Sequence, residues 1–313
     1  ETLKRNQRSS ETLINKRFPS IVCGPKDRVY TVYTANEKES SDIYLQCYDG
    51  EKVSEMIPIA NTDADEYDAA IIMDKNHKFW IAWTSNQSGR YKTHMACFRD
   101  VNKIDRLGIL SLPGDDVMHP RMAVDRNGDL WITYYQWLDY KGRSRDREVY
   151  VRKLSNNKWS APIQVSPNDV PWYEDHTEPA IIPYDNGVMV AWGWDYHGPY
   201  DQYSKYVNTP SVFVRAIKDT GIVGPIHSVS GKNIDMTPAM ISLEDQKVYC
   251  VWDSMDSGCM RSLSFAYPST TEDIPAGKIQ QLCKAKNICS PCFASDEKGL
   301  LSLVWSETKD YQN

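Results

Sequence analysis

Apolar and polar residues recur along this chain in one repeated order. A short apolar strand leads into a tight polar turn, and a second apolar strand follows that ends in an aromatic residue. Residues 118–134, MHPRMAVDRNGDLWITY, carry this order most clearly. Asn127-Gly128 between two apolar runs predicts a β-hairpin, because both central residues of the favoured turn need a positive φ angle.

The same hairpin pattern occurs at five other places, and the six units begin near residues 17, 67, 118, 177, 236 and 289. Self-similarity at a period of roughly 50 to 60 residues indicates a solenoid, a propeller or another array. Third strands rich in β-branched residues are predicted to begin at Ile43, His94, Val149, Val212 and Ser262. With a fourth strand leading to the next unit, the pattern predicts an all-β fold, a six-bladed β-propeller with four antiparallel strands per blade.

The repeat predicts one domain that spans residues 1–313, since no segment between units reads as a linker. Residues 1–16 precede the first unit and resemble the outer strands of the other units. The sixth unit stops at Asn313 with only its first two strands supplied. We therefore expect residues 1–16 to form the outer strands of the last blade, which closes the ring and leaves no open sheet edge.

Charge and composition narrow the class of partner. The 313 residues carry a net charge of −6, which argues against a nucleic-acid partner because such a protein needs a concentrated basic face. No apolar run approaches the length of a membrane span. The chain begins at Glu1 without a recognisable targeting segment. A mature exported protein, from which such a segment has been removed, and a cytosolic protein would both begin in this way.

The sequence contains no pattern that indicates a metal or another cofactor. Residues 125–129 match the start of a calcium loop, but the glycine is misplaced and no bidentate glutamate follows. We interpret this stretch as a hairpin turn. The eight cysteines are scattered, mostly at strand positions, and we expect buried free thiols. Cys289 and Cys292 have redox spacing but lack the strand-to-helix context that activates a thiol.

One position in each repeat varies in a way that predicts a binding site. The residue before the repeat proline, or before Ala69 in the second unit, is expected to lie at the mouth of the central channel. These residues are Phe18, Asp68, His119, Glu178, Thr237 and Ser290. A purely structural ring would use similar residues six times, so the mixture of acid, imidazole, hydroxyl and aromatic predicts one asymmetric site.

The two longest loops between second and third strands add aromatic and charged residues beside this ring. They follow Tyr134 and Trp192, and residues 171–178 contribute a third such stretch. Aromatic faces stack on sugar rings while carboxylates bond the hydroxyls, so this composition suits a glycan or another polar ligand. The structural alternative is that these aromatics fix the long loops to the scaffold. The predicted ligand contacts are Arg17, Tyr67, His119, Tyr135, Trp137, Trp172, His176, Trp194 and His197.

Asp68, Glu178 and Asp195 are the carboxylates best placed to converge. Paired carboxyl groups are what glycoside cleavage requires, one as acid and one as nucleophile or base. His119 suits an acid, a base or a metal ligand. A structural hydrogen bond is the alternative role for each of these side chains.

With these residues in view, the chain resembles the sialidase-like (BNR-type) six-bladed propellers. The segment RFPS at Arg17 is similar to the Arg-Ile-Pro signature that supplies the first arginine of a carboxylate-binding triad. The sialidase Asp-box, Ser-x-Asp-x-Gly-x-Thr-Trp, is not matched, because AVDRNGDLW has one residue too many between Asp125 and Gly128. The resemblance implies a protein that cuts or binds glycans and an extracytoplasmic location, whether secreted, periplasmic or surface-bound.

Two classes of function follow from the sequence. The first is a glycan-binding or glycan-processing propeller, related to glycoside hydrolases, with Asp68, Glu178 and Asp195 as candidate catalytic residues. The second is a non-catalytic propeller that binds a protein partner or serves as a scaffold module. Unlike residues at equivalent positions disfavour a multivalent lectin, which would keep the same sugar contacts in every blade.

Overall fold

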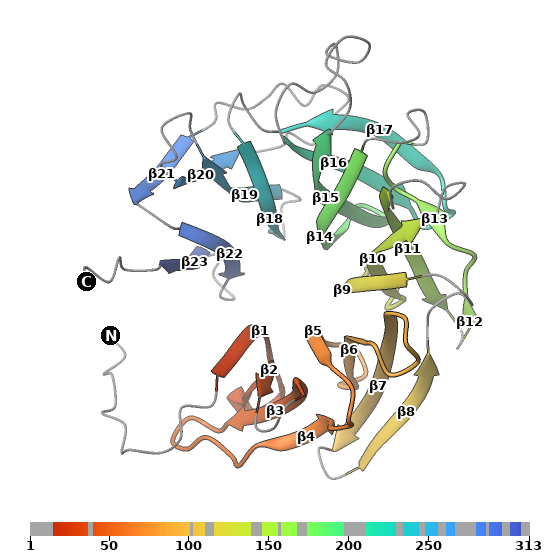
Figure 1. Ribbon diagram of the computed structural model, residues 1–313, viewed down its shortest axis with the longest axis vertical. Coiled ribbons are helices and arrows are strands. Elements are labelled where there is room, and N and C mark those ends of the chain that lie inside the picture. The colour runs from red at the N-terminus through yellow and green to blue at the C-terminus, as the bar shows by residue number, and fades with distance from the viewer. Residues whose placement is uncertain are drawn as a thin grey trace.

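The computed structural model describes residues 15–36, 40–100, 103–109, 116–138, 146–155, 158–167, 174–196, 211–229, 234–243, 248–255, 261–266, 280–285, 288–295 and 301–307. These residues are almost entirely β-strands arranged as antiparallel blades of a propeller (Figure 1). The helical element among the described residues is a short 3₁₀ turn, η1 (Pro25–Asp27). The predicted all-β propeller is therefore confirmed.

Each predicted hairpin is present, and each begins one to three residues before the expected position. The short polar turns make these pairings local, which is why the alternation of apolar residues predicted them. The hairpins are β1 (Asn15–Cys23) with β2 (Val29–Asn36), β5 (Glu66–Met73) with β6 (Phe79–Ser85), β9 (Asp116–Val124) with β10 (Leu130–Leu138), β14 (Glu174–Tyr184) with β15 (Gly187–Tyr196), β18 (Ile234–Ser242) with β19 (Val248–Met255), and β22 (Ile288–Ser295) with β23 (Leu301–Glu307).

The outer strands continue each blade away from the central axis. Each third strand pairs antiparallel with the second strand of its hairpin. The outer strands are β3 (Asp42–Tyr48), β4 (Ile57–Ala60), β7 (Lys92–Asp100), β8 (Lys103–Ile109), β11 (Asp146–Ser155), β12 (Lys158–Trp159), β13 (Ile163–Gln164), β16 (Ser211–Lys218), β17 (Val223–Ser228), β20 (Arg261–Ala266) and β21 (Gln280–Ala285).

The number of sheets differs from the prediction. The described residues form five sheets rather than six, because one sheet contains nine strands. In that sheet β11 and β14 meet through a single parallel contact between Arg147 and Asp175. A similar backbone contact joins other neighbours, where the Glu66 N–H donates to Ser41 O and the Val117 N–H donates to Tyr91 O. Neighbouring blades therefore touch through their backbones at several junctions. At the junction of β11 with β14 the contact has the geometry of parallel strand pairing, which merges two blades into one sheet.

The hydrophobic core lies between neighbouring sheets. The aromatic residues that close the second strands fill it: Tyr33, Trp83, Tyr134, Trp192 and Trp252 are at most 5% exposed. Trp305 on β23 is different and is 42% exposed. β22 and β23 form a two-stranded sheet in the described part of the chain. Residues 1–16 were predicted to complete this sheet. For Asn15 and Lys16 the prediction is wrong, because they extend the inner strand β1 and pair with β2, and residues 1–14 lie outside the described residues.

Two hairpin turns are fixed by an aspartate. Asp125 Oδ1 accepts hydrogen bonds from the Asn127 and Asp129 amides, and Asp125 Oδ2 accepts one from Trp131 Nε1 at 2.9 Å. Asp74 makes the same set of bonds with its own turn and with Trp80. The interpretation of residues 125–129 as a hairpin turn is confirmed.

The remaining expectations concern cysteines and the membrane. Cys97 and Cys250 are buried free thiols as predicted, whereas Cys23 and Cys292 are free and exposed. The sequence pattern did not reveal that these two residues are exposed. Among the helices of the described residues, none has the length and apolar character that a bilayer crossing demands.

Candidate functional site

The site is built on a backbone irregularity that recurs in the inner strands. Every inner strand shifts register at the repeat position, including β22 between Cys289 and Cys292. At five of these bulges the residue before the proline or alanine has a positive φ, between 46° and 59°: Phe18, Asp68, His119, Glu178 and Thr237. Positive φ is uncommon outside glycine and costs conformational energy, and such residues concentrate at functional sites.

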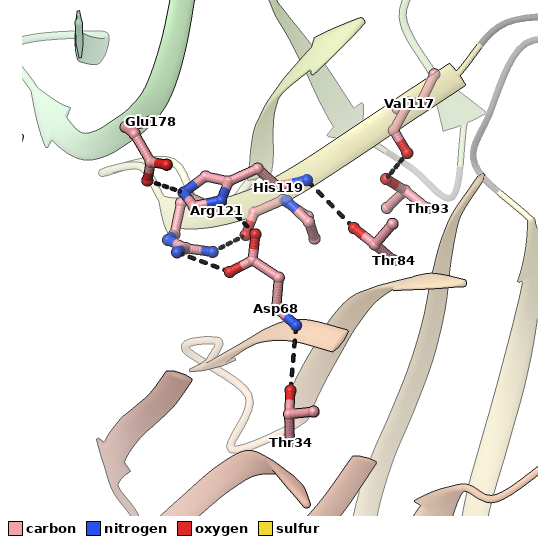
Figure 2. A network of polar contacts seen from close by, with 9 residues as sticks. Thr34, Asp68, Thr84, Thr93, Val117, His119, Arg121 and Glu178 are labelled. Carbon is pink, nitrogen blue, oxygen red and sulfur yellow. Dashed lines mark hydrogen bonds and ion pairs between the residues drawn. The ribbon is translucent and has the colours of Figure 1, made fainter. Parts of the chain in front are cut away.

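The strands of the preceding sheet hold two of these bulges in place. The Asp68 N–H donates to Thr34 Oγ1 at 3.3 Å, and the His119 N–H donates to Thr84 Oγ1 at 3.2 Å (Figure 2). Both threonine side chains are buried. The backbone under Asp68 and His119 is therefore fixed by a neighbouring blade, as a site with defined geometry requires.

His119 joins two acidic side chains that come from different strands. Its Nδ1 contacts Asp68 Oδ2, and its Nε2 lies 3.1 Å from Glu178 Oε2 (Figure 2). Asp68 also receives a hydrogen bond from Arg121, whose Nη2 lies 3.1 Å from Oδ1. Inner strands β5, β9 and β14 thus supply one continuous polar network, and Figure 1 shows these three strands as neighbours around the axis.

The two carboxyl groups of this network differ in exposure and charge environment. The Asp68 side chain is 9% exposed, whereas that of Glu178 is 36% exposed. Burial acts to raise the pKa of Asp68, but the nearby charges of His119 and Arg121 and their hydrogen bonds outweigh it, so the pKa lies below its usual value. Asp68 is therefore a buried, ionised group, and Glu178 is the more exposed of the two carboxyl groups.

Aromatic side chains adjoin the network on β10. The Tyr135 ring stacks on His119 at a centroid distance of 6.0 Å, and the Arg147 guanidinium lies 5.8 Å from the centroids of both Tyr135 and Trp137. Burial raises the pKa of Tyr135 to about 12 although Arg147 acts in the opposite direction. Tyr135 is thus a neutral phenol that donates or accepts hydrogen bonds.

Tyr67 lies beside Asp68 in the chain and meets Tyr91 edge to face, with ring centroids 5.9 Å apart. Burial, followed by the nearby Tyr91 and Tyr135, raises its pKa above the usual range. Tyr67 and Tyr135 thus offer neutral hydroxyls near the network, and Tyr91 packs against Tyr67. Of these, Tyr67 and Tyr135 were predicted ligand contacts, and Tyr91 was not.

Two predicted ligand contacts are buried. His176 is 0% exposed and Trp194 is 8% exposed. Trp192 Nε1 donates to His176 Nδ1 at 3.1 Å, and His176 Nε2 lies 3.8 Å from Glu148. The sequence led us to expect His176 and Trp194 at the surface, but the alternation along β14 and β15 turns both toward the interior. Their contact with a ligand stays a prediction.

The other predicted site residues lie apart from the network or outside the described structure. Arg17 is exposed and lines a groove of about 290 Å³ with Lys16, Tyr33 and Tyr48 on β1 to β3, and none of Asp68, His119 or Glu178 lines it. Asp195 lies in β15, and its backbone pairs with Asp175. The Asp195 side chain, Trp172 and His197 lie outside the described residues.

The network does not have the geometry of a metal site. Among the described residues, no group of three or more His, Cys, Asp and Glu side chains is arranged to hold a metal ion. The two nitrogens of His119 point to opposite sides of the ring, each toward a different carboxylate, so the three side chains do not converge on one point.

Arg121 belongs to the polar network and was not predicted from the sequence, although a signal for it existed. It follows Pro120 directly, and the equivalent positions in the other units are small: Ser20, Ala70, Ala180, Ala239 and Cys292. A single cation among five small residues marks it as an exception. Arg147 was missed because its role depends on the pairing of β10 with β11, which a local pattern does not reveal.

Comparison with solved structures supports the fold. An α-L-arabinanase of Penicillium chrysogenum, solved with arabinobiose, is 12% identical, with 91% of this chain and 86% of that chain covered at a TM-score of 0.63. The NanB sialidase of Streptococcus pneumoniae is 9% identical, with 95% of this chain and 66% of that chain covered at a TM-score of 0.61.

A family 93 α-L-arabinofuranosidase of Fusarium graminearum, also solved with arabinobiose, is 11% identical, with 83% of this chain and 79% of that chain covered at a TM-score of 0.58. No protein-family model matches the sequence, and no curated protein matches it. The chain therefore shares the fold of sialidase and glycoside hydrolase structures, and at this identity the likeness concerns the fold alone.

Proposed function

We propose that this protein is a glycan-cleaving enzyme of the glycoside hydrolase type, with Glu178 and Asp68 as its reacting carboxyl groups. The observation that carries the proposal is the His119 imidazole, which holds these two carboxyl groups on opposite sides of one ring. Glycoside hydrolases place two carboxyl groups about 5 to 10 Å apart across the scissile bond. The imidazole ring between them keeps these two carboxyl groups out of direct contact with each other.

The different environments of the two carboxyl groups suit different roles. Glu178 is the more exposed, which suits the group that gives a proton to the departing sugar oxygen. Asp68 is held ionised by Arg121 and His119, which suits stabilisation of the positive charge that develops on the sugar ring. A carboxylate has about four lone-pair positions, so Asp68 can accept a further hydrogen bond from water while it keeps both partners.

The surrounding side chains suit a carbohydrate ligand. Tyr67 and Tyr135 supply neutral hydroxyls beside the carboxyl pair, and Trp137 extends the aromatic surface along β10. We propose that Trp172, Asp195 and His197 also contact the ligand, as the sequence predicts. The likeness in fold to structures solved with arabinobiose is consistent with a carbohydrate but does not identify the sugar.

The test uses a panel of aryl glycosides and a glycan-binding array with the wild type and Glu178→Gln. We expect the wild type to cleave at least one substrate and Glu178→Gln to lose about 10² to 10⁴ of kcat on substrates with poor leaving groups, since general acid catalysis contributes that much. Glu51→Gln, which changes an exposed acid between β3 and β4, is the matched control and keeps full activity.

Two results would contradict the proposal. Turnover by Glu178→Gln at the wild-type rate on every substrate would remove Glu178 from the reaction. Glycan binding by both proteins without any turnover would identify a non-catalytic carbohydrate-binding propeller instead.

We also propose that the propeller has six blades in a single domain, residues 1–313. In this interpretation the nine-stranded sheet counts as two blades that meet at the contact of Arg147 with Asp175. Residues 1–14 would then supply outer strands beside β23, and Asn15 and Lys16 belong to β1, where they pair with β2.

An extracytoplasmic location is proposed from the resemblance to sialidase-like propellers. The exposed thiols of Cys23 and Cys292 give a direct test, because free thiols persist in reducing compartments and are oxidised outside them. Cell fractionation of the producing organism, with thiol labelling of the purified native protein, checks this location. Protein confined to the cytoplasm would contradict it.

A further inference from the structure

His119 uses both ring nitrogens, and this restricts where protons lie in the site. Its Nδ1 contacts Asp68 Oδ2, and Asp68 is an ionised acceptor. Nδ1 therefore carries a proton and donates it. At the other side, Nε2 and Glu178 Oε2 are 3.1 Å apart, which is a hydrogen-bond distance between a nitrogen and an oxygen. A hydrogen bond there needs one further proton, on Nε2 or on Oε2.

We infer that His119 is a positioning residue that stores and returns the catalytic proton of Glu178. The inference rests on the proposed function and adds a residue to it. The proton of the contact is stored on Nε2, the more basic atom of the two, and passes to Oε2 as Glu178 protonates the substrate, so that the imidazole supplies a proton that a partly exposed carboxyl group would otherwise lose to water. Asp68 and Arg121 fix the ring so that Nε2 always faces Glu178.

The proton count closes over one cycle. Glu178 gives its proton to the glycosidic oxygen as the carbon–oxygen bond breaks, and the alcohol leaves. Water then attacks the sugar carbon and releases one proton. That proton returns to the shared position between Glu178 and His119, so hydrolysis consumes one water and leaves the pair unchanged.

The groups that face His119 are consistent with a shared proton. Asp68 lies on β5, Glu178 on β14, Tyr135 on β10 and Arg121 on β9 itself. Behind Tyr135, the Arg147 guanidinium on β11 adds a second positive charge to the surroundings. Arg121 is paired with Asp68, which leaves His119 as the basic group in contact with Glu178 among the described residues.

The test compares His119→Gln with the wild type on aryl glycosides whose leaving groups range from poor to good. A good leaving group such as dinitrophenolate departs without a proton, so only poor leaving groups report the supply of that proton. We expect His119→Gln to lose about 10²-fold or more of kcat on poor leaving groups and to stay within about threefold on dinitrophenyl glycosides. KM should change little, because the imidazole is not proposed to contact the sugar.

The pH profile gives a second readout that a merely structural role would not move. Imidazole releases its proton near pH 6.5 in water and a carboxyl group near pH 4.3. With substrates that have poor leaving groups, loss of the imidazole should therefore move the basic limb of the pH profile of kcat/KM to lower pH by about two units. His94→Gln is the matched control, since His94 on β7 stacks on Trp83 and should keep the wild-type profile.

The results for Glu178→Gln and His119→Gln together show which proposal fails, the proposed function or the role of His119. If Glu178→Gln loses activity and His119→Gln keeps both the wild-type leaving-group dependence and the wild-type limb, the inference is wrong and the proposed function stands. If Glu178→Gln keeps full activity on poor leaving groups, the proposed function is wrong. His119→Asn, which suits the left-handed backbone at φ 58°, replaces His119→Gln if circular dichroism shows that the glutamine variant does not fold.

Discussion

Asp68 illustrates how much of the site depends on single contacts. Its buried carboxylate contacts His119 through one oxygen and Arg121 through the other, while its backbone N–H is bound to Thr34. The burial acts to raise its pKa, and the interactions with His119 and Arg121 overcome that effect. A buried carboxylate with a lowered pKa stabilises the folded state only at pH values where it is ionised.

Asp68→Asn should therefore show a pH-dependent loss of stability. Near neutral pH we expect the free energy of unfolding to fall by about 1.5–3 kcal/mol, the usual contribution of hydrogen bonds to a charged group. Because the folded-state pKa lies below that of the unfolded chain, this difference is complete above about pH 4 and shrinks as the pH falls further. Urea denaturation of both proteins at pH 7 and pH 3 measures it. A constant difference at both pH values would contradict the electrostatic explanation.

The sequence was informative about residues that vary at a repeated position. Asp68, His119 and Glu178 stood out because the repeat defines equivalent sites, and the structure brings these three side chains together. The sequence did not indicate which side chains of a strand are buried and which are exposed. His176 and Glu178 are two residues apart on β14, yet a strand that bulges between Thr177 and Ala180 buries one and exposes part of the other.

At the scale of elements, the aspartate-fixed turns explain why the hairpins form where they do. Asp125 is 1% exposed and binds two amides of its own turn as well as the indole of Trp131, which is fully buried. One side chain thus ties the turn to the core between sheets. The unmatched Asp-box spacing in the sequence did not indicate this role, because the bonds depend on the three-dimensional shape of the turn.

Asp125→Ala should destabilise the protein by about 2–4 kcal/mol, since each buried donor left without a partner costs about 1–3 kcal/mol. Asp74→Ala removes the same bonds from a turn where the aspartate is only partly buried, and we expect a smaller loss. Chemical denaturation of the two variants gives the comparison. Equal losses would mean that burial of the aspartate does not set the cost.

Local pairings were predictable at this scale and distant ones were not. Alternation along 17 residues specifies a hairpin, and the six hairpins were located to within three residues. The contact of β11 with β14 involves residues from different units and no periodic signal. This is why the sequence predicted six separate sheets and the described residues form five.

At the scale of the whole molecule, large apolar side chains are exposed at both the first and the last sheet. Trp305 on β23 is 42% exposed, and Ile21 and Val53 on the first sheet are 57% and 61% exposed. In the other sheets the equivalent aromatic residues are buried between neighbours. The proposed completion of the last blade adds strands to the sheet that carries Trp305.

Deletion of residues 1–14 tests this arrangement. If the segment completes the last blade, the deletion exposes a sheet edge and lowers Tm, by about 2–4 °C for each kcal/mol lost in a domain of this size class. The matched control replaces residues 1–14 with a Gly/Ser segment of equal length, which retains chain length without strand-forming residues. Thermal unfolding followed by circular dichroism measures the shift. An unchanged Tm in both proteins would contradict the proposed ring closure.

Five inner strands present one residue each on the same left-handed backbone, and these residues are an aromatic, two acids, an imidazole and a hydroxyl. The bulge sets the backbone there, so exchanging a side chain alters the chemistry of the channel mouth without shifting the chain. A change of side chain at one of these positions therefore needs neither an insertion in the chain nor a new loop conformation. We therefore expect point substitutions at these five positions to alter the polar network while the strands around it keep their pairing.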